Sequence, residues 1–118
     1  MGKRYGLSRA ERITRKRQFD RVFQEGTRRG GPLIAVRCIP NGLSTSRLGI
    51  ALGRGWRGTV ARNQAKRLVR EAFRTHKHEL PEGMDIVVVP RTNWDPPRVE
   101  SLAAELCRLA SPPEEEPR

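Results

Sequence analysis

The chain has 118 residues, which is enough for one domain with a single hydrophobic core. It carries 24 Lys and Arg residues against 13 Asp and Glu, a net charge of +11. This excess predicts a polyanionic partner, because each phosphate that a protein neutralises releases condensed counterions. No apolar run approaches the roughly 18 residues of a membrane helix. No signal-peptide pattern opens the chain, so we expect a cytoplasmic protein with no membrane partner.

The positive charge is unevenly distributed along the chain. Residues 1–78 contain 20 basic and 4 acidic side chains, a net of +16, whereas residues 79–118 contain 4 basic and 9 acidic, a net of −5. This asymmetry predicts a nucleic-acid surface in the first part and a C-terminal part that completes the fold. Cys38 and Cys107 lie in apolar surroundings and lack the close spacing of a zinc site, so we expect two reduced thiols and no metal site.

The N-terminal region is predicted to contain a loose arm and one helix. Residues 1–13 are basic and poorly patterned, which indicates an arm without regular structure. Residues 15–24 form a predicted helix, since Phe19, Val22 and Phe23 recur on one face.

Three strands are expected. Residues 32–39 and 47–52 are β-like and separated by turn residues, which predicts an antiparallel hairpin. Residues 85–90 contain an uninterrupted apolar run, which is typical of a central strand covered on both faces.

Two further helices complete the predicted domain. One spans residues 59–78 with Thr59 as its N-cap, and the other begins at Asp95. Residues 1–110 are therefore expected to form a single nucleic-acid-binding domain, and the proline- and glutamate-rich residues 111–118 a disordered tail. The order α-β-β-α-β-α predicts an α/β protein, a small α+β sandwich of helices packed on a short sheet.

The helix at residues 59–78 carries a basic face opposite an apolar face. At 100° per residue, its basic residues and one asparagine fall within an arc of about 140°. These residues are Arg62, Asn63, Lys66, Arg67, Arg70, Arg74 and Lys77. An ordinary solvated face mixes both signs, whereas like charges four residues apart repel by a few tenths of a kcal/mol per pair. A row of RNA phosphates explains why that repulsion is tolerated.

A glycine loop precedes this helix. The pattern Gly53-x-Gly55-x-x-Gly58 satisfies the dinucleotide-binding fingerprint. The chain has too few strands for a doubly wound fold, and the bulky Trp56 would crowd a pyrophosphate. We therefore expect no nucleotide cofactor, and we expect the loop and the helix N-terminus to bind an RNA phosphate instead.

The sequence at residues 62–74, RNQAKRLVREAFR, resembles the signature helix of the bacterial ribonuclease P protein subunit. Residues 17–23 with Gly26 are similar to the first helix of that family, and residues 48–52 and 85–91 are similar to two of its strands. The resemblance covers roughly residues 9–109. It implies a mostly four-stranded sheet and an unusual left-handed βαβ crossover in place of the common right-handed one.

The resemblance also implies a function. In this family a large RNA subunit is the catalyst, and it uses Mg²⁺ held mainly by RNA to cleave the 5′ leader from precursor tRNA. The protein is an accessory subunit with no catalytic residue of its own. The residues implied to bind the RNA subunit are Arg54, Arg57, Arg62, Asn63, Lys66, Arg67, Arg70 and Arg74. Those implied to line a cleft for the leader are Arg15, Lys16, Phe19, Phe23, Val36 and Arg37.

The sequence departs from the family pattern at three places. Gln64 stands where the family has the third residue of an Arg-Asn-Arg triplet, and Arg54-Gly55 stands where relatives tend to have two basic residues. Arg37 aligns with an aromatic residue in many relatives.

Two other functions compete with this one. The first is a non-enzymatic ribosomal or assembly protein that binds structured RNA. The second is a ribonuclease that acts without RNA. The sequence argues against it, because His76 and His78 lack an expected acid partner. The residues also leave open whether Phe19 and Phe23 stack on RNA or only pack in the core.

Overall fold

The computed structural model describes residues 7–92 and 94–110, which contain three α-helices and one four-stranded sheet. This architecture confirms the predicted α+β fold class. The predicted disordered tail at 111–118 lies outside the described residues. In chain order the elements are a 3₁₀ turn (Arg9–Glu11), α1 (Lys16–Glu25), β1 (Thr27–Gly30), β2 (Ile34–Pro40), β3 (Arg47–Ile50), α2 (Thr59–His76), a second 3₁₀ turn (Lys77–Glu79), β4 (Met84–Pro90) and α3 (Val99–Ala110).

The strands lie in the order β1-β2-β4-β3. Strand β4 is antiparallel to β2 and parallel to β3, and Val88 pairs with Val36 on one side and Ile50 on the other. The central position predicted from the apolar run in β4 is confirmed. The predicted hairpin between β2 and β3 is wrong, because β4 lies between them.

Strand β1 was not predicted. It pairs antiparallel with β2 at the edge of the sheet and consists of Thr27, Arg28, Arg29 and Gly30. An edge strand of this composition has no alternating apolar residues that would mark it in the sequence. The chain therefore supplies three strands before α2, and the parallel β3-α2-β4 unit forms the crossover, whose hand stays a prediction.

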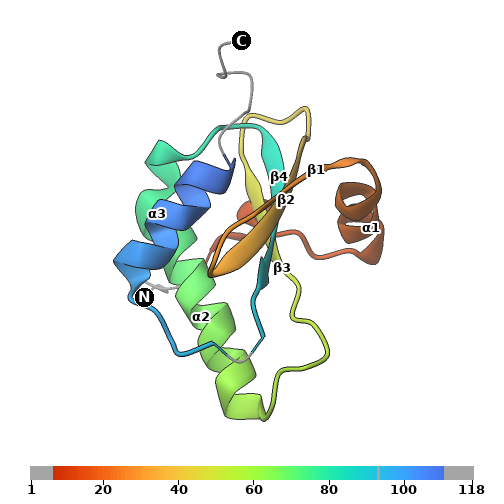
Figure 1. The fold of residues 1–118 in the computed structure, drawn as a ribbon. Coiled ribbons are helices and arrows are strands. Elements are labelled where there is room, and N and C mark those ends of the chain that lie inside the picture. Colours follow the sequence, from red (N-terminus) through yellow and green to blue (C-terminus); the bar gives the residue numbers. More distant parts are fainter. Residues whose placement is uncertain (1–6, 93, 111–118) are drawn as a thin grey trace.

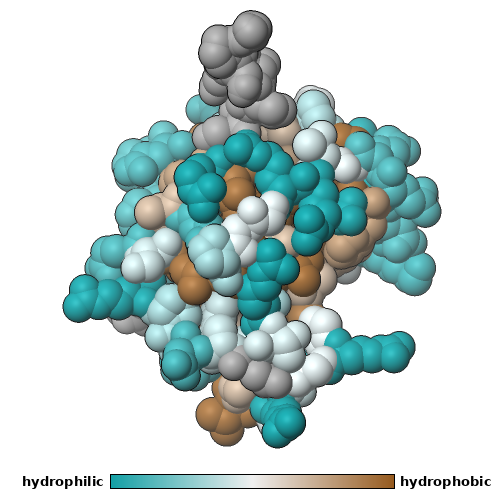
Figure 2. All heavy atoms as spheres, in the orientation of Figure 1, coloured by the Kyte–Doolittle hydropathy of each residue, from teal (hydrophilic) through white to brown (hydrophobic). Residues whose placement is uncertain are grey.

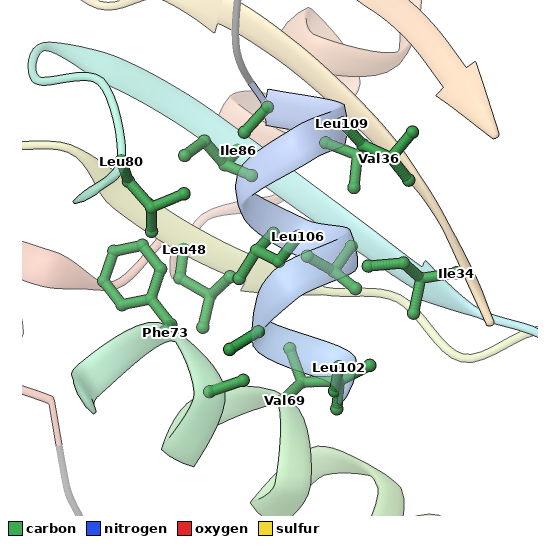
Figure 3. Close-up of a cluster of buried hydrophobic side chains, with 14 of the residues drawn as sticks. Ile34, Val36, Leu48, Val69, Phe73, Leu80, Ile86, Leu102, Leu106 and Leu109 are labelled. Atoms are coloured by element: carbon green, nitrogen blue, oxygen red, sulfur yellow. The ribbon is translucent and has the colours of Figure 1, made fainter. Parts of the chain in front are cut away.

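The helices cover both faces of the sheet (Figure 1). Helices α2 and α3 pack together on one face, over the larger core, and α1 lies on the other. Figure 3 shows side chains of α2, α3 and the sheet meeting in this core. A smaller cluster of Ile13, Val22, Ile39 and Val87 fills the space under α1.

Residues 7–13 do not form the loose arm that the sequence predicts. Leu7 and Ile13 are buried, and the Ile13 amide donates a 3.0 Å hydrogen bond to the Leu48 carbonyl. Arg12 also forms an isolated parallel bridge with Leu48. This segment thus lies along the outer edge of β3. Residues 1–6 of the predicted arm lie outside the described residues.

Two helix starts differ from the predicted ones. The N-cap of α2 is Gly58 rather than Thr59, and its φ of 80° is a left-handed conformation that favours glycine. Helix α3 begins at Val99 rather than at Asp95.

Candidate nucleic-acid interface

The basic side of α2 has an exposed middle and half-buried margins. Asn63, Gln64 and Arg67 are exposed, while Lys66 and Arg70 are half-buried because they lie next to the side that packs on the core. Ala65, Val69, Ala72 and Phe73 form that packed side. The predicted division of the helix into an apolar side that packs on the core and a basic side that faces away from it is therefore present in the structure.

One member of the predicted basic set, Arg74, is paired within the helix. Arg74 donates a 2.8 Å hydrogen bond to the Glu71 carboxylate, so part of its charge is neutralised within the helix. Arg62 is half-buried at the first turn of α2. In Figure 2 hydrophilic side chains cover most of the visible face, and smaller hydrophobic areas show between them.

The glycine loop before α2 is held against the segment that follows β4. Trp56 is 7% exposed, and its ring meets the Trp94 ring edge to face at a centroid distance of 5.8 Å. A Cβ added at Gly55 would lie 2.7 Å from Thr92 Cγ2, so glycine permits this close approach. The loop thereby places Arg54 and Arg57, both exposed, beside the start of α2. This anchoring role of Trp56 was not predicted, because the sequence alone marks it only as a bulky loop residue.

A hollow of about 320 Å³ is lined by Phe23 of α1 and by residues of the sheet and its adjoining segments, and we name it the α1–sheet hollow. Phe23 contributes an aromatic ring that is 39% exposed. The Arg37 guanidinium lies over that ring, 5.5 Å from its centroid, and Arg37 Nη1 donates a 3.3 Å hydrogen bond to the Phe23 carbonyl. Arg28 and Arg91 add two further cations to the wall. Both were missed, Arg28 because its strand was not predicted and Arg91 because it follows a strand of otherwise apolar character.

A second hollow of about 170 Å³ lies at the outer edge of β3, and we name it the β3-edge hollow. The Phe19 ring packs against Gly49, where an added Cβ would lie 2.7 Å from a ring carbon. Arg12, Lys66 and Arg70 line the same space. Phe19 and Phe23, which were predicted to line one cleft, therefore face two different hollows.

The remaining predicted cleft residues do not all reach a hollow. Val36 is 1% exposed and belongs to the core on the α2 and α3 side of the sheet, so its assignment to the cleft is wrong. A strand alternates its side chains between the two faces, and the sequence did not reveal which face Val36 takes. Arg15 and Lys16 are exposed at the start of α1, where Lys16 pairs with Asp20 at 2.9 Å.

Of the two histidines near the end of α2, His78 has an acid neighbour, which the sequence did not lead us to expect. His78 Nε2 lies 3.3 Å from Glu79 Oε2, and the His76 and His78 rings stack at a centroid distance of 6.5 Å. Over residues 7–92 and 94–110, no three His, Cys, Asp or Glu side chains gather in a way that could hold a metal ion. In the same ranges no helix is long and apolar enough to cross a membrane.

The basic side of α2, the anchored glycine loop and the two arginine-lined hollows define a small α+β protein suited to binding nucleic acid. The family profile described as Ribonuclease P matches residues 7–112. The chain therefore belongs to the ribonuclease P protein family.

Individual relatives agree with this membership. The ribonuclease P protein component of Thermotoga maritima is 43% identical over 85 residues, covering 72% of this chain and 73% of the relative. That of Desulfotalea psychrophila is 32% identical over 107 residues, covering 88% and 89%. The solved structure of the Thermotoga maritima protein superposes with a TM-score of 0.76 at 35% identity, covering 85% of this chain and 94% of the other.

Proposed function

We propose that this chain is the protein subunit of a ribonuclease P ribonucleoprotein, which removes the 5′ leader from precursor tRNA. The observation that carries the proposal is the family match across residues 7–112, which contain both the basic side of α2 and the α1–sheet hollow. The alternative of a ribosomal or assembly protein is not favoured, because the curated relatives compared above are ribonuclease P protein components.

The catalytic RNA subunit is the proposed partner of α2 and the glycine loop. Asn63 and Arg67 are exposed on the same side of the helix, where a guanidinium group can donate to two phosphate oxygens at once. Gln64 beside them is exposed and uncharged, so it can donate to RNA oxygens but adds no Coulombic attraction. We place the contact with the RNA subunit at Arg54, Arg57, Arg62, Asn63, Lys66, Arg67, Arg70 and Arg74.

The 5′ leader of precursor tRNA is the proposed ligand of the α1–sheet hollow. An exposed phenylalanine ring supports sequence-tolerant stacking on bases, and arginines near it attract the backbone. Because Arg37 lies over the Phe23 ring, a base stacks on the combined surface of guanidinium and ring rather than on a bare ring. Arg28, the register partner of Arg37, and Arg91 also line the hollow and are proposed to contact leader phosphates.

The hydrolytic chemistry is proposed to belong to the RNA subunit, and the protein acts as an accessory subunit of the endoribonuclease. The side chains that face the two hollows include several cations, which repel Mg²⁺, so the ions are expected on RNA and substrate phosphates. We place the complex in the cytoplasm, where precursor tRNA is processed.

Reconstitution with a bacterial ribonuclease P RNA tests the proposal. The protein should permit cleavage of a precursor tRNA at a Mg²⁺ concentration too low for the RNA subunit alone. The protein without RNA should release no leader. Unchanged cleavage on addition of folded protein, over a full Mg²⁺ titration, would refute the role of a ribonuclease P subunit.

A further inference from the structure

We infer that the β3-edge hollow is a binding site for one RNA phosphodiester group, held jointly by Arg12, Lys66 and Arg70. The inference rests on the proposed function for the identity of the RNA. It adds to that function a site that includes the N-terminal segment, which was expected to be a loose arm.

The charges around the hollow lack internal neutralisation. Among the described residues, no carboxylate lies within ion-pair distance of Arg12, Lys66 or Arg70. Glu11, the acid next to Arg12 in sequence, is engaged by Lys77 instead. Three cations that line one space repel each other. An anion bound between them is attracted to all three, and this attraction offsets the repulsion.

The walls of the hollow suit a single phosphate group. The volume of about 170 Å³ is small, and Phe19, Leu48 and Ile50 supply apolar surface beside the cations. Apolar walls lower the local dielectric constant, which strengthens attraction between the cations and a bound anion. Two guanidinium groups and one ammonium group supply enough donors for the non-bridging oxygens of a phosphodiester.

The backbone fixes the position of Arg12 before any ligand binds. Its strand-like bridge to Leu48 and the adjacent hydrogen bond from Ile13 both use main-chain atoms. Lys66 and Arg70 are four residues apart on α2 and project to the same side. Binding therefore requires only side-chain ordering, and replacing the Arg12 side chain leaves the backbone contacts in place.

Side chains from both helices line the hollow, since Lys66 and Arg70 belong to α2 and Phe19 belongs to α1. The phosphodiester group comes either from the catalytic RNA or from the leader of the substrate. Both sources present the same chemistry.

Anion binding by the protein alone tests the site apart from the proposed function. Inorganic pyrophosphate is titrated into the full chain, and amide NMR shifts are followed for Ile13, Gly49 and Ile50. Arg12→Gln should weaken binding about tenfold, as expected for one charge-assisted hydrogen bond. Arg9→Gln removes the same charge from the same segment but does not line the hollow, so its affinity should stay within about twofold of the wild type. Equal loss in both variants, or no shifts at these amides, would refute the site.

Phosphate neutralisation identifies the source. Single methylphosphonate linkages are placed in the RNA subunit or in the leader, and binding is measured with wild type, Arg12→Gln and Arg9→Gln proteins. One methylphosphonate linkage should weaken RNA binding by the wild type but hardly change binding by Arg12→Gln. The RNA that carries this linkage is the source of the phosphodiester group. Arg12→Gln should also reduce the slope of log affinity against log salt by about 0.7 for single-stranded RNA. If Arg12→Gln responds to every linkage as Arg9→Gln does, no phosphodiester occupies the hollow, even where reconstituted cleavage succeeds.

Discussion

The guanidinium group of Arg47 donates two hydrogen bonds to the carboxylate of Asp85, each 2.7 Å long. These residues are register partners on the parallel strands β3 and β4. Asn41 adds a 2.9 Å hydrogen bond to Asp85 Oδ1, and Asp85 is 1% exposed. The arrangement joins the start of β3 to the start of the central strand β4.

Loss of the Asp85 charge should destabilise the fold. Asp85→Asn leaves the half-buried Arg47 without its charge partner, and removing one member of a buried ion pair costs about 3 kcal/mol. The free energy of unfolding, measured by urea denaturation at pH 7, should fall by about this amount. Asp95→Asn changes an exposed aspartate and should leave the urea midpoint unchanged. Equal midpoints for Asp85→Asn and the wild type would show that the pair contributes nothing.

Ionisation of Asp85 should also make the free energy of unfolding depend on pH. Burial alone would raise the pKa of Asp85, but hydrogen bonds from Arg47 and Asn41 outweigh it and hold the pKa below its usual value. Because the pKa of Asp85 is lower in the folded chain than in the unfolded chain, its ionised carboxylate stabilises the fold at pH values above the unfolded-state pKa of about 4. This stabilisation is lost as the pH falls through the pKa of the folded state. Urea titrations between pH 7 and pH 2 should show a smaller acid loss for Asp85→Asn than for the wild type. Parallel curves would contradict the assignment.

Arg67 should contribute to binding of the RNA subunit. Arg67→Gln removes an exposed charge from the middle of the basic side of α2, so affinity should fall and the salt slope should flatten by about one unit. Filter binding at several salt concentrations measures both quantities. Arg108→Gln removes an exposed charge from α3, outside the proposed surface, and serves as the matched control. If Arg108→Gln lowers the salt slope as much as Arg67→Gln does, the effect comes from net charge and not from a contact made by Arg67.

The two phenylalanines of α1 should behave differently. Phe23→Leu removes a ring from the α1–sheet hollow and should weaken binding of precursor tRNA with a leader, while binding of leaderless tRNA stays the same. Phe19→Leu alters packing against Gly49 and Ile13, so it should lower stability by about 1 kcal/mol. The affinity of the holoenzyme for each tRNA measures the effect of Phe23→Leu, and urea midpoints measure the effect of Phe19→Leu. If Phe23→Leu affects both tRNAs equally, the hollow does not bind the leader.

Cys38 should be unreactive in the folded protein. Burial raises the pKa of its thiol to about 12, which leaves very little thiolate at neutral pH. At pH 7.5 maleimide should modify Cys38 at least tenfold more slowly in the native chain than in urea, as followed by mass spectrometry of its peptide. Similar rates in both states would contradict this pKa shift.

The sequence predicted those elements whose pattern depends on burial. The apolar run of β4, the two-sided α2 and the helical spacing of Phe19 and Val22 all follow from which side chains avoid water. Strand β1 has no such pattern, since its residues are largely exposed and its pairing with β2 uses backbone groups. The mistaken hairpin arose because the sequence does not show that β4, far away along the chain, inserts between β2 and β3.

The candidate site shows the same limit. The charges on α2 could be found from the sequence because their helical spacing is local. The grouping of Arg12 with Lys66 and Arg70 depends on an N-terminal segment lying along β3, and the role of Arg91 depends on where β4 ends. Trp56 and Trp94 are 38 positions apart, and only the tertiary structure shows that they meet.

Directed cleavage of RNA from two tethering points tests most directly whether α2 binds the catalytic RNA while the α1–sheet hollow binds the leader. Exposed Gln64 on α2 and Gln24 on α1 are each replaced with cysteine in a Cys107→Ser background, which leaves in place the half-buried Cys38, whose thiol pKa is raised. Iron–EDTA attached to the cysteine generates hydroxyl radicals in the assembled complex with precursor tRNA. If α2 binds the catalytic RNA and the α1–sheet hollow binds the leader, Gln64→Cys should give strand breaks in the catalytic RNA and Gln24→Cys in the 5′ leader. Breaks in the same RNA segment from both positions would contradict it.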